Sequence, residues 1–283
     1  MNRARPTATA SALLAEARAR LAEPREAVIL VAHALGLPRE VLYAHPEREI
    51  PPAVAESALA LIARRIAGEP VAYLTGAREF YGLALAITPA ALIPRPETEL
   101  VVELALACVE KLVAPRIADV GTGSGAIALA LAHARLDACI TASDRSAAAL
   151  GVAARNARAL ALENISLVRA DALAAFAPQA FDLIVSNPPY VAAGDPHLDE
   201  GDLRFEPPAA LVAGADGLAV IRRLITDASV HLKPGGTLIL EHGADQQPAI
   251  RRLLAERGYV DIEAHHDLAD LPRAVAATRP EPL

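Results

Sequence analysis

From Ile117 onward the sequence alternates short apolar runs of strand character with helical stretches, and this alternation limits the fold more than any other feature. Strands and helices that alternate in this way build a mostly parallel sheet with helices on both faces. The strand-like runs are centred near Ile117, Ile140, Leu167, Leu183, Leu238, Ile262 and Val275. We therefore predict an α/β fold with a doubly wound, seven-stranded sheet.

The N-terminal part of the chain has a different pattern. Between residues 9 and 67 apolar side chains recur at helical spacing, and prolines divide the segment into short helices with no strand predicted among them. We predict that residues 1–69 form a small helical bundle. Two roles stay open for it: packing against its neighbour, or docking a substrate protein.

The next segment, residues 70–95, joins this bundle to the α/β domain. Apolar residues there alternate near period two around Gly76 and Gly82, which indicates an extended linker or a β-hairpin. Pro96 and the carboxylates beside it are typical of a first helical turn. The α/β domain is therefore predicted to span residues 96–283.

Composition excludes several classes of protein. Hydrophobic residues make up 53% of the 283-residue chain, but no stretch approaches the roughly 18 uninterrupted apolar residues of a membrane span. No signal-peptide pattern is found, so we expect a cytoplasmic protein that does not bind membranes. Cys108 and Cys139 lack CxxC spacing and a neighbouring His cluster, so no disulfide framework and no metal site are predicted.

The net charge of −7 is unevenly distributed. Residues 1–90 carry 10 Lys and Arg against 9 Asp and Glu, whereas the remainder carries 17 against 25. Proteins that bind nucleic acids usually do so through basic surfaces that neutralise phosphates. Nucleic acid is therefore not expected as a partner.

A glycine-rich turn follows the strand at Ile117 and leads into an Ala- and Leu-rich helix. It reads Gly121-Thr122-Gly123-Ser124-Gly125. Glycines let a backbone turn tightly and approach a ligand closely, because no Cβ stands in the way. With Ala126 the turn also satisfies the GxGxxG/A pattern of dinucleotide-binding proteins, so a nicotinamide cofactor stays open as an alternative.

Two acidic residues follow the next strands along the chain. Asp144 lies about 20 residues beyond the glycine turn, where a carboxylate can accept hydrogen bonds from both hydroxyls of a ribose. S-adenosylmethionine and nicotinamide dinucleotides both carry such a ribose. Asp171-Ala172 follows the third strand, where the loop is predicted to meet an adenine. A solvated loop acid without a ligand is the alternative for Asp171.

The fourth strand, residues 181–186, ends directly in Asn187-Pro188-Pro189-Tyr190. Open α/β sheets bind ligands at the carboxyl ends of their strands, so this tetrapeptide should face the cofactor. Pro189 forces Pro188 into an extended conformation, and neither proline has an N–H to donate. A plain proline-rich turn that closes a strand is the alternative interpretation.

The tetrapeptide is suited to hold a planar NH₂ group. The side-chain carbonyl of Asn187 and the main-chain carbonyl of Pro188 can accept both of its hydrogens. An amide or exocyclic amine nitrogen is a poor nucleophile because its lone pair is delocalised, so orientation against an activated methyl group is the main need. Tyr190 would stack beside the planar group and exclude water.

Together these segments resemble the bacterial-type glutamine N5-methyltransferases of peptide chain release factors. The resemblance covers nearly the whole chain. It rests on residues 68–73 (GEPVAY), 78–82 (REFYG), 92–99 (LIPRPETE), 119–125, 185–190, 195–198 (DPHL), 204–207 (RFEP) and 240–243 (LEHG).

The resemblance implies a Rossmann-like methyltransferase domain with its last strand inserted antiparallel, and an N-terminal helical domain joined to it by a hairpin. The implied cofactor is S-adenosyl-L-methionine, with S-adenosyl-L-homocysteine as product. The implied substrate is the glutamine of the GGQ motif in class 1 release factors. Carried over by position, residues 121–125, Asp144, Ala172 and Asn187 line the cofactor, and residues 187–190 bind the glutamine. Ala172 departs from the bulky aromatic expected in some relatives, which weakens the expected adenine contact.

Two further segments acquire an interpretation from this resemblance. Arg95 and Glu97 are expected in the wall around the methionine end of the cofactor, with helix capping as the alternative. The acidic residues of loop 191–208 are expected to be solvated, with a basic release-factor surface as the other interpretation; they are Asp195, Asp199, Glu200, Asp202 and Glu206.

Four alternatives to this function remain open at this point. A ribosomal-protein glutamine methyltransferase, or a DNA methyltransferase acting on adenine N6 or cytosine N4, would use the same tetrapeptide on a similar NH₂ group. A nicotinamide-dependent oxidoreductase would explain the glycine turn and Asp144 but leaves residues 187–190 without a role. A non-catalytic scaffold would need only the fold.

Overall fold

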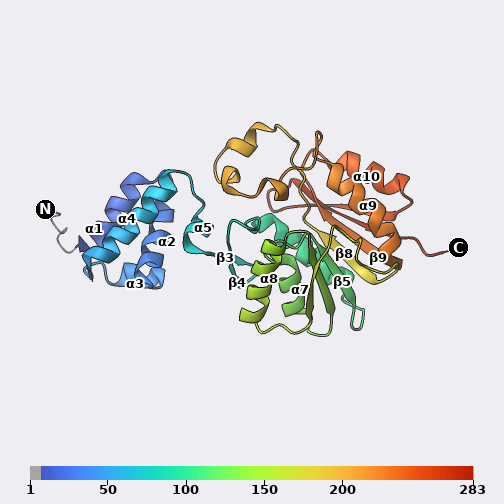
Figure 1. The fold of residues 1–283 in the computed structure, drawn as a ribbon, viewed down its shortest axis with the longest axis horizontal. Coiled ribbons are helices and arrows are strands. Elements are labelled where there is room, and N and C mark those ends of the chain that lie inside the picture. Colours follow the sequence, from blue (N-terminus) through green and yellow to red (C-terminus); the bar gives the residue numbers. More distant parts are fainter. Residues whose placement is uncertain (1–7, 283) are drawn as a thin grey trace. The chain divides into compact units, whose positions relative to one another are not determined.

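The structure is a computed structural model that describes residues 8–282, and residues 1–7 and 283 lie outside the description. The chain divides into two compact units. One comprises the chain up to Ala77 together with Asp199–Phe205, and the other comprises Arg78–Leu198 and the chain from Glu206 onward. Figure 1 labels many of their helices and strands.

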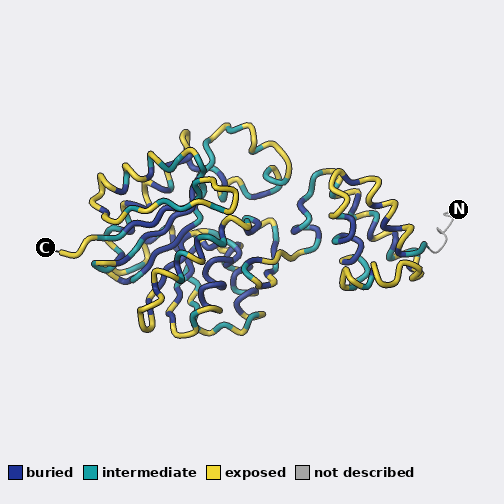
Figure 2. Tube along the Cα trace, turned by 180° about the vertical axis from the view of Figure 1, so that it is seen from behind, coloured by how far each residue is buried: buried dark blue, intermediate teal, exposed yellow. Residues whose placement is uncertain are grey.

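The first unit is built from short helices around one apolar core. They are α1 (Ala10–Arg20), α2 (Pro24–Leu35), α3 (Arg39–Ala44), α4 (Pro52–Ile66) and α5 (Val71–Thr75). Helix α2 packs against the other helices, and its side chains Leu30 and Val31 are fully buried. Figure 2 shows the buried inner faces and the exposed outer faces of these helices. The predicted helical bundle is present.

Two details of the first unit differ from the predictions. A short antiparallel strand pair, β1 (Ala8–Thr9) with β2 (Glu49–Ile50), lies in a region predicted to have no strands. Two-residue strands are too short to show a period of two, so the sequence pattern could not reveal them. The start of the predicted linker is also helical: Pro70 precedes α5, and Gly76, at φ 69°, ends it in the left-handed conformation that glycine favours.

The expected hairpin follows, with β3 (Ala77–Phe80) and β4 (Leu83–Ala86) as a two-stranded sheet. A 3₁₀ turn, η1 (Pro96–Thr98), then leads into α6 (Glu99–Cys108), so the helix start predicted near Pro96 is confirmed. Further 3₁₀ turns occur at η2 (Pro196–Asp199), η3 (Leu203–Phe205) and η4 (Pro208–Ala210).

The second unit contains a seven-stranded sheet of order β10-β11-β9-β8-β5-β6-β7. Its strands are β5 (Arg116–Val120), β6 (Cys139–Asp144), β7 (Ile165–Arg169), β8 (Phe181–Ser186), β9 (Leu232–Glu241), β10 (Val260–His266) and β11 (Pro272–Thr278). Strands β5 to β9 are parallel, and β11 lies antiparallel between β9 and β10. Each of the seven predicted strands and the antiparallel insertion of the last one are confirmed.

Helices cover both faces of this sheet (Figure 1). They are α6, α7 (Ala126–Ala134) and α8 (Ala147–Ala159) on one face, and α9 (Ala219–His231) and α10 (Gln247–Glu256) on the other. The doubly wound α/β fold is therefore confirmed. No helix in residues 8–282 combines the length and the apolar character needed to cross a membrane.

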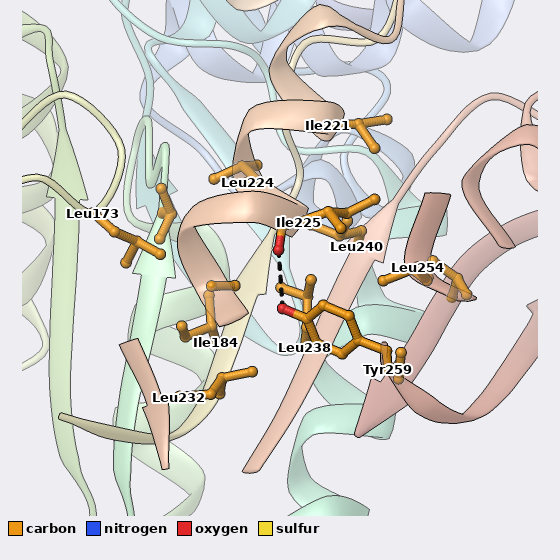
Figure 3. Packing of buried hydrophobic residues seen from close by; sticks show 14 of the residues in the cluster. Leu173, Ile184, Ile221, Leu224, Ile225, Leu232, Leu238, Leu240, Leu254 and Tyr259 are labelled. Carbon is orange, nitrogen blue, oxygen red and sulfur yellow. Dashed lines mark hydrogen bonds between the residues drawn. The ribbon is translucent and has the colours of Figure 1, made fainter. Parts of the chain in front are cut away.

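The core under α9 fixes the strands that end at the cavity described below. Figure 3 shows Ile221, Leu224 and Ile225 of α9 pointing toward the side chains of β8 and β9. Tyr259 closes this cluster, and its hydroxyl donates to the main-chain oxygen of Ile225 at 3.1 Å. Because the cluster is apolar and its buried hydroxyl is satisfied, it holds β8 and β9 firmly.

Candidate active site

A cavity of about 390 Å³ lies at the carboxyl edge of the parallel strands, within the second unit. Small-molecule sites commonly have volumes of this order. The predicted site residues that line it are Gly121, Thr122, Gly123, Ser124, Asp144, Asp171, Ala172, Asn187, Pro188 and Pro189. Residues at the ends of four strands, β5, β6, β7 and β8, are thus brought to one place.

The glycine turn after β5 is tied to the end of β6. The N–H groups of Gly121 and Thr122 donate to the Ser143 main-chain oxygen at 2.8 and 2.9 Å. Gly121 has φ 74° and Gly123 has φ 58°, in the left-handed region where a side chain would be strained. The glycines therefore allow a tight turn whose backbone lines the cavity.

Gly125, predicted to contact the cofactor, is not among the lining residues; it begins α7 at φ 90°. A Cβ there would stand 2.9 Å from Leu129 Cδ1 and 3.2 Å from Ala153 Cβ. The absence of a side chain at this position serves the packing of α7 against α8.

Asp144 lines the cavity beside the glycine turn. Its Oδ2 accepts from the Gly123 N–H at 3.0 Å, and its Oδ1 accepts from the Ser146 N–H at 2.8 Å. Each carboxylate oxygen has a second lone pair, so both can accept a further hydrogen bond from a ligand hydroxyl. The two backbone bonds fix the carboxylate in a defined direction.

Asp171 also lines the cavity, but its carboxylate already has a partner. Arg223 of α9 donates to Asp171 Oδ2 at 2.8 Å and to its main-chain oxygen at 3.3 Å. The next residue, Ala172, has φ 51° and packs against the apolar cluster under α9. Asp171 therefore contributes a salt bridge at the rim of the cavity, and Ala172 offers it only a methyl group.

The lining also includes Asp119, which was not predicted as a site residue. Only 1% of it is exposed; its Oδ2 accepts from Thr122 Oγ1 at 2.6 Å and from the Ala128 N–H at 3.1 Å. Its Oδ1 has no hydrogen-bond partner in the described part of the chain. Burial raises the pKa of Asp119 to about 7, and the nearby charge of Asp144 adds to this rise. The sequence did contain a signal for this role, because Asp119 is an acidic residue among the apolar residues near the end of β5.

We expect Asp119→Asn to change how stability depends on pH. Because the pKa of Asp119 is raised from 3.8 to about 7, the folded protein binds a proton that the unfolded chain releases, and this group's contribution to stability falls as pH rises between those values. Asparagine does not titrate. The original chain should therefore lose free energy of unfolding between pH 4 and pH 8 that the variant keeps, and this difference should be on the order of 3 kcal/mol. Urea unfolding of both proteins at the two pH values measures this; equal pH dependence would contradict it.

The segment after β8 is held at both ends. Asn187 Nδ2 donates to Thr98 Oγ1 at 3.0 Å, and the Tyr190 hydroxyl donates to Glu241 Oε1 at 3.3 Å. No described residue donates to Asn187 Oδ1. Pro188 is buried in the cavity wall, and Tyr190 packs against the apolar cluster instead of lining the cavity. The segment thus presents the Asn187 carbonyl as an available acceptor.

Thr98 and Glu241 were also missed by the sequence analysis as site residues. Thr98 belongs to η1 and lines the cavity, and Glu241 ends β9 with 1% of its surface exposed. Burial raises the pKa of Glu241 to about 7, a rise opposed by the Thr98 hydroxyl, the Arg273 charge and Tyr190. The family resemblance could have pointed to both residues, because each stands in a segment on which the resemblance rests. Their contacts with residues 187–190 cannot be predicted from the order of residues along the chain.

The prediction for Glu206 is wrong, whereas the segment around Arg95 lines the cavity through its neighbours Pro94 and Thr98. Arg95 does not line the cavity; it pairs with Glu206, whose Oε2 also accepts from the Ile93 N–H at 2.9 Å. Glu206 was expected to be solvated but is only 3% exposed. A buried carboxylate is stable when it is paired and hydrogen-bonded, so Glu206 ties its loop to the segment before η1. No group of three His, Cys, Asp or Glu suited to a metal occurs in residues 8–282.

Comparisons with known proteins agree with this architecture. The family model "PrmC N-terminal domain" matches residues 7–76, and "Methyltransferase small domain" matches residues 98–201. The solved structure of the T. thermophilus 16S rRNA N2 G1207 methyltransferase, in complex with AdoMet and guanosine, has a TM-score of 0.54 at 21% identity over 72% of this chain and 49% of its own. That is a likeness of fold.

Relatives of similar length give the closer assignment. The release factor glutamine methyltransferase of Burkholderia pseudomallei (strain K96243) is 49% identical over 287 residues, covering 99% of this chain and all of its own. The enzyme of the same description from Escherichia coli (strain K12) is 47% identical over 249 residues, 88% of this chain and 90% of its own. On this similarity, the chain belongs to the release factor glutamine methyltransferase family.

Proposed function

We propose that this protein transfers the methyl group of S-adenosyl-L-methionine to the side-chain amide nitrogen, N5, of the glutamine in the GGQ motif of class 1 peptide chain release factors. S-adenosyl-L-homocysteine is the second product. The observation that carries the proposal is the single cavity lined both by the glycine turn with Asp144 and by Asn187, Pro188 and Pro189. Residues suited to hold the cofactor and residues suited to hold the substrate amide thus line the same cavity in a chain of this family.

The residues of the cavity fit the cofactor. Asp144 offers carboxylate oxygens for the ribose hydroxyls, and the glycine turn lets the backbone approach closely. The unpartnered Oδ1 of Asp119 is a buried acceptor that a bound donor would satisfy. Asp171 and Ala172 lie where the adenine is proposed to bind, with Ala172 too small to stack on it. When bound, S-adenosylmethionine supplies an activated methyl group.

The acceptor side follows from the available carbonyls. Asn187 Oδ1 and the Pro188 main-chain oxygen accept the two hydrogens of the glutamine amide, which orients its nitrogen toward the methyl group. With the cofactor bound, the nitrogen would gain the methyl carbon while the carbon–sulfur bond breaks and leaves its electron pair on sulfur, and one of the two nitrogen protons would pass to solvent. Proximity of this kind is worth roughly 7 to 11 kcal/mol for well-aligned groups. Tyr190, fixed by Glu241, closes the side of the segment against water.

The parts of the chain have separate roles in this proposal. Residues 96–283 carry out the methyl transfer, residues 70–95 connect the units, and the helical bundle of residues 1–69 docks the release factor. Support for the docking role is the match of residues 7–76 to a separate domain model, "PrmC N-terminal domain". The bundle's own surface keeps apolar side chains exposed, with Tyr43 at 60% and Ile66 at 53%.

Labelled cofactor tests this function against its nearest rivals. The protein is incubated with radiolabelled S-adenosylmethionine and, separately, a class 1 release factor, a ribosomal-protein mixture and duplex DNA. We expect label in the release factor, and mass spectrometry should place one added methyl group on the GGQ glutamine. Label in DNA alone, or in a ribosomal protein alone, would assign the activity to one of the alternatives.

A further inference from the structure

The contacts around residues 187–190 raise a question that the proposed mechanism leaves open. An asparagine amide has an acceptor end and a donor end of nearly the same shape, and a rotation by half a turn about its last side-chain bond exchanges them. Only the orientation with the carbonyl toward the substrate can accept a hydrogen from an NH₂ group. Something in the site must therefore select this orientation.

Thr98 is placed to make that selection. Its Oγ1 lies 3.0 Å from Asn187 Nδ2, and its side chain is 3% exposed, so water does not compete for this contact. A hydroxyl oxygen accepts from the amide NH₂ end only when its own hydrogen is directed elsewhere. The orientation of Asn187 thus depends on where the Thr98 hydrogen points.

Glu241 holds the other end of the same segment. Its Oε1 accepts from the Tyr190 hydroxyl at 3.3 Å. Residues 187–190 are thus fixed at both ends, and the contact with Thr98 is the one that bears on the orientation of the Asn187 amide.

We propose that Thr98 is a positioning residue for methyl transfer: it holds the NH₂ end of Asn187 so that the Asn187 carbonyl faces the substrate amide. This inference rests on the proposed function. Thr98 belongs to η1, and it acts on the substrate through Asn187.

Variants of Thr98 test the selection of the Asn187 orientation. Thr98→Val keeps the shape of the side chain but removes the acceptor, so both amide orientations become accessible. We expect kcat to fall about ten- to a hundredfold, while the dissociation constant for S-adenosylmethionine, measured by calorimetry, stays within a few fold. Thr98→Ser restores the hydroxyl and should recover most of kcat. A purely structural role predicts that valine, which packs equally well, is tolerated.

Two outcomes would overturn this inference: an unchanged kcat in Thr98→Val, or no recovery of kcat in Thr98→Ser. If the original chain labels a release factor and Thr98→Val labels it equally fast, the inference alone is wrong. If the original chain does not label a release factor although it binds S-adenosylmethionine, the proposed function is wrong and the inference with it.

Discussion

Asn187→Ala is expected to lower kcat/KM for release-factor methylation by about a hundred- to a thousandfold, the usual effect of removing one preorganised polar group from the reacting centre. Alanine removes the side-chain carbonyl, to which no described residue donates a hydrogen bond, and also the NH₂ group that donates to Thr98. The substrate nitrogen would then lose one of its two acceptors and its alignment with the methyl group. Initial rates of methyl transfer at saturating cofactor measure the effect.

Cofactor binding should separate this effect from general damage. Asn187 contributes one wall of the cavity, so we expect its loss to change the dissociation constant for S-adenosylmethionine only a few fold. Asn164→Ala is a matched control, because Asn164 is also half-buried and hydrogen-bonded, but to the main-chain oxygens of Ala132, Arg135 and Ala138 away from the cavity. The control should keep its kcat. Near-normal turnover in Asn187→Ala would count against the amide grip.

Asp144→Ala should instead weaken cofactor binding. The carboxylate would accept the ribose hydroxyls, and the net loss of one hydrogen bond to a charged group costs about 1.5–3 kcal/mol. Alanine also removes the acceptor that holds the Gly123 N–H at 3.0 Å, so the glycine turn loses a support. We expect the dissociation constant for S-adenosylmethionine to rise about tenfold to a hundredfold, measured by calorimetric titration.

Asp137→Ala provides the comparison for Asp144. Asp137 is likewise a loop aspartate with ordered partners, Arg135 at 2.9 Å and the Ala114 N–H at 3.1 Å, but it stands before β6 and does not line the cavity. We expect its removal to leave cofactor affinity unchanged. If Asp137→Ala and Asp144→Ala weaken binding equally, or if neither does, the ribose assignment is wrong.

Features that repeat along the chain were predictable from sequence. The inner strands of the sheet, such as β5 and β8, have apolar runs because they are buried, and the regular alternation of strands with helices favours the doubly wound arrangement. The glycine turn and Asn187-Pro188-Pro189-Tyr190 each follow a strand, so their presence at the carboxyl edge follows from parallel pairing alone. This edge was therefore identifiable before any tertiary contact was known.

Contacts that depend on tertiary packing were not predictable in this way. Asn187 meets Thr98 across 89 positions of sequence, and Tyr190 meets Glu241 across 51. Periodicity describes which face of an element is buried but not which polar group on another element it meets. Glu206 could not be placed from sequence for the same reason. The acidic composition of loop 191–208 suggested that it is solvated, but its pairing with Arg95 places it in the interior.

Short elements were the other gap. Helix α5 is a single turn of five residues, too short to distinguish a period of 3.6 from a period of two. The pairing of β1 with β2 involves two residues on each side, and no local pattern predicts a bridge between segments 40 positions apart. Both lie in the first unit, where the residues that line the cavity are not found.

A crystal structure with S-adenosyl-L-homocysteine and a glutamine peptide from a release-factor GGQ loop would test the central claim most directly. We expect the glutamine amide nitrogen to face the cofactor sulfur, with its two hydrogens donated to Asn187 Oδ1 and to the Pro188 main-chain oxygen at hydrogen-bond distance. A structure in which Asn187 turns away from the sulfur, or in which the glutamine amide contacts neither carbonyl, would contradict it.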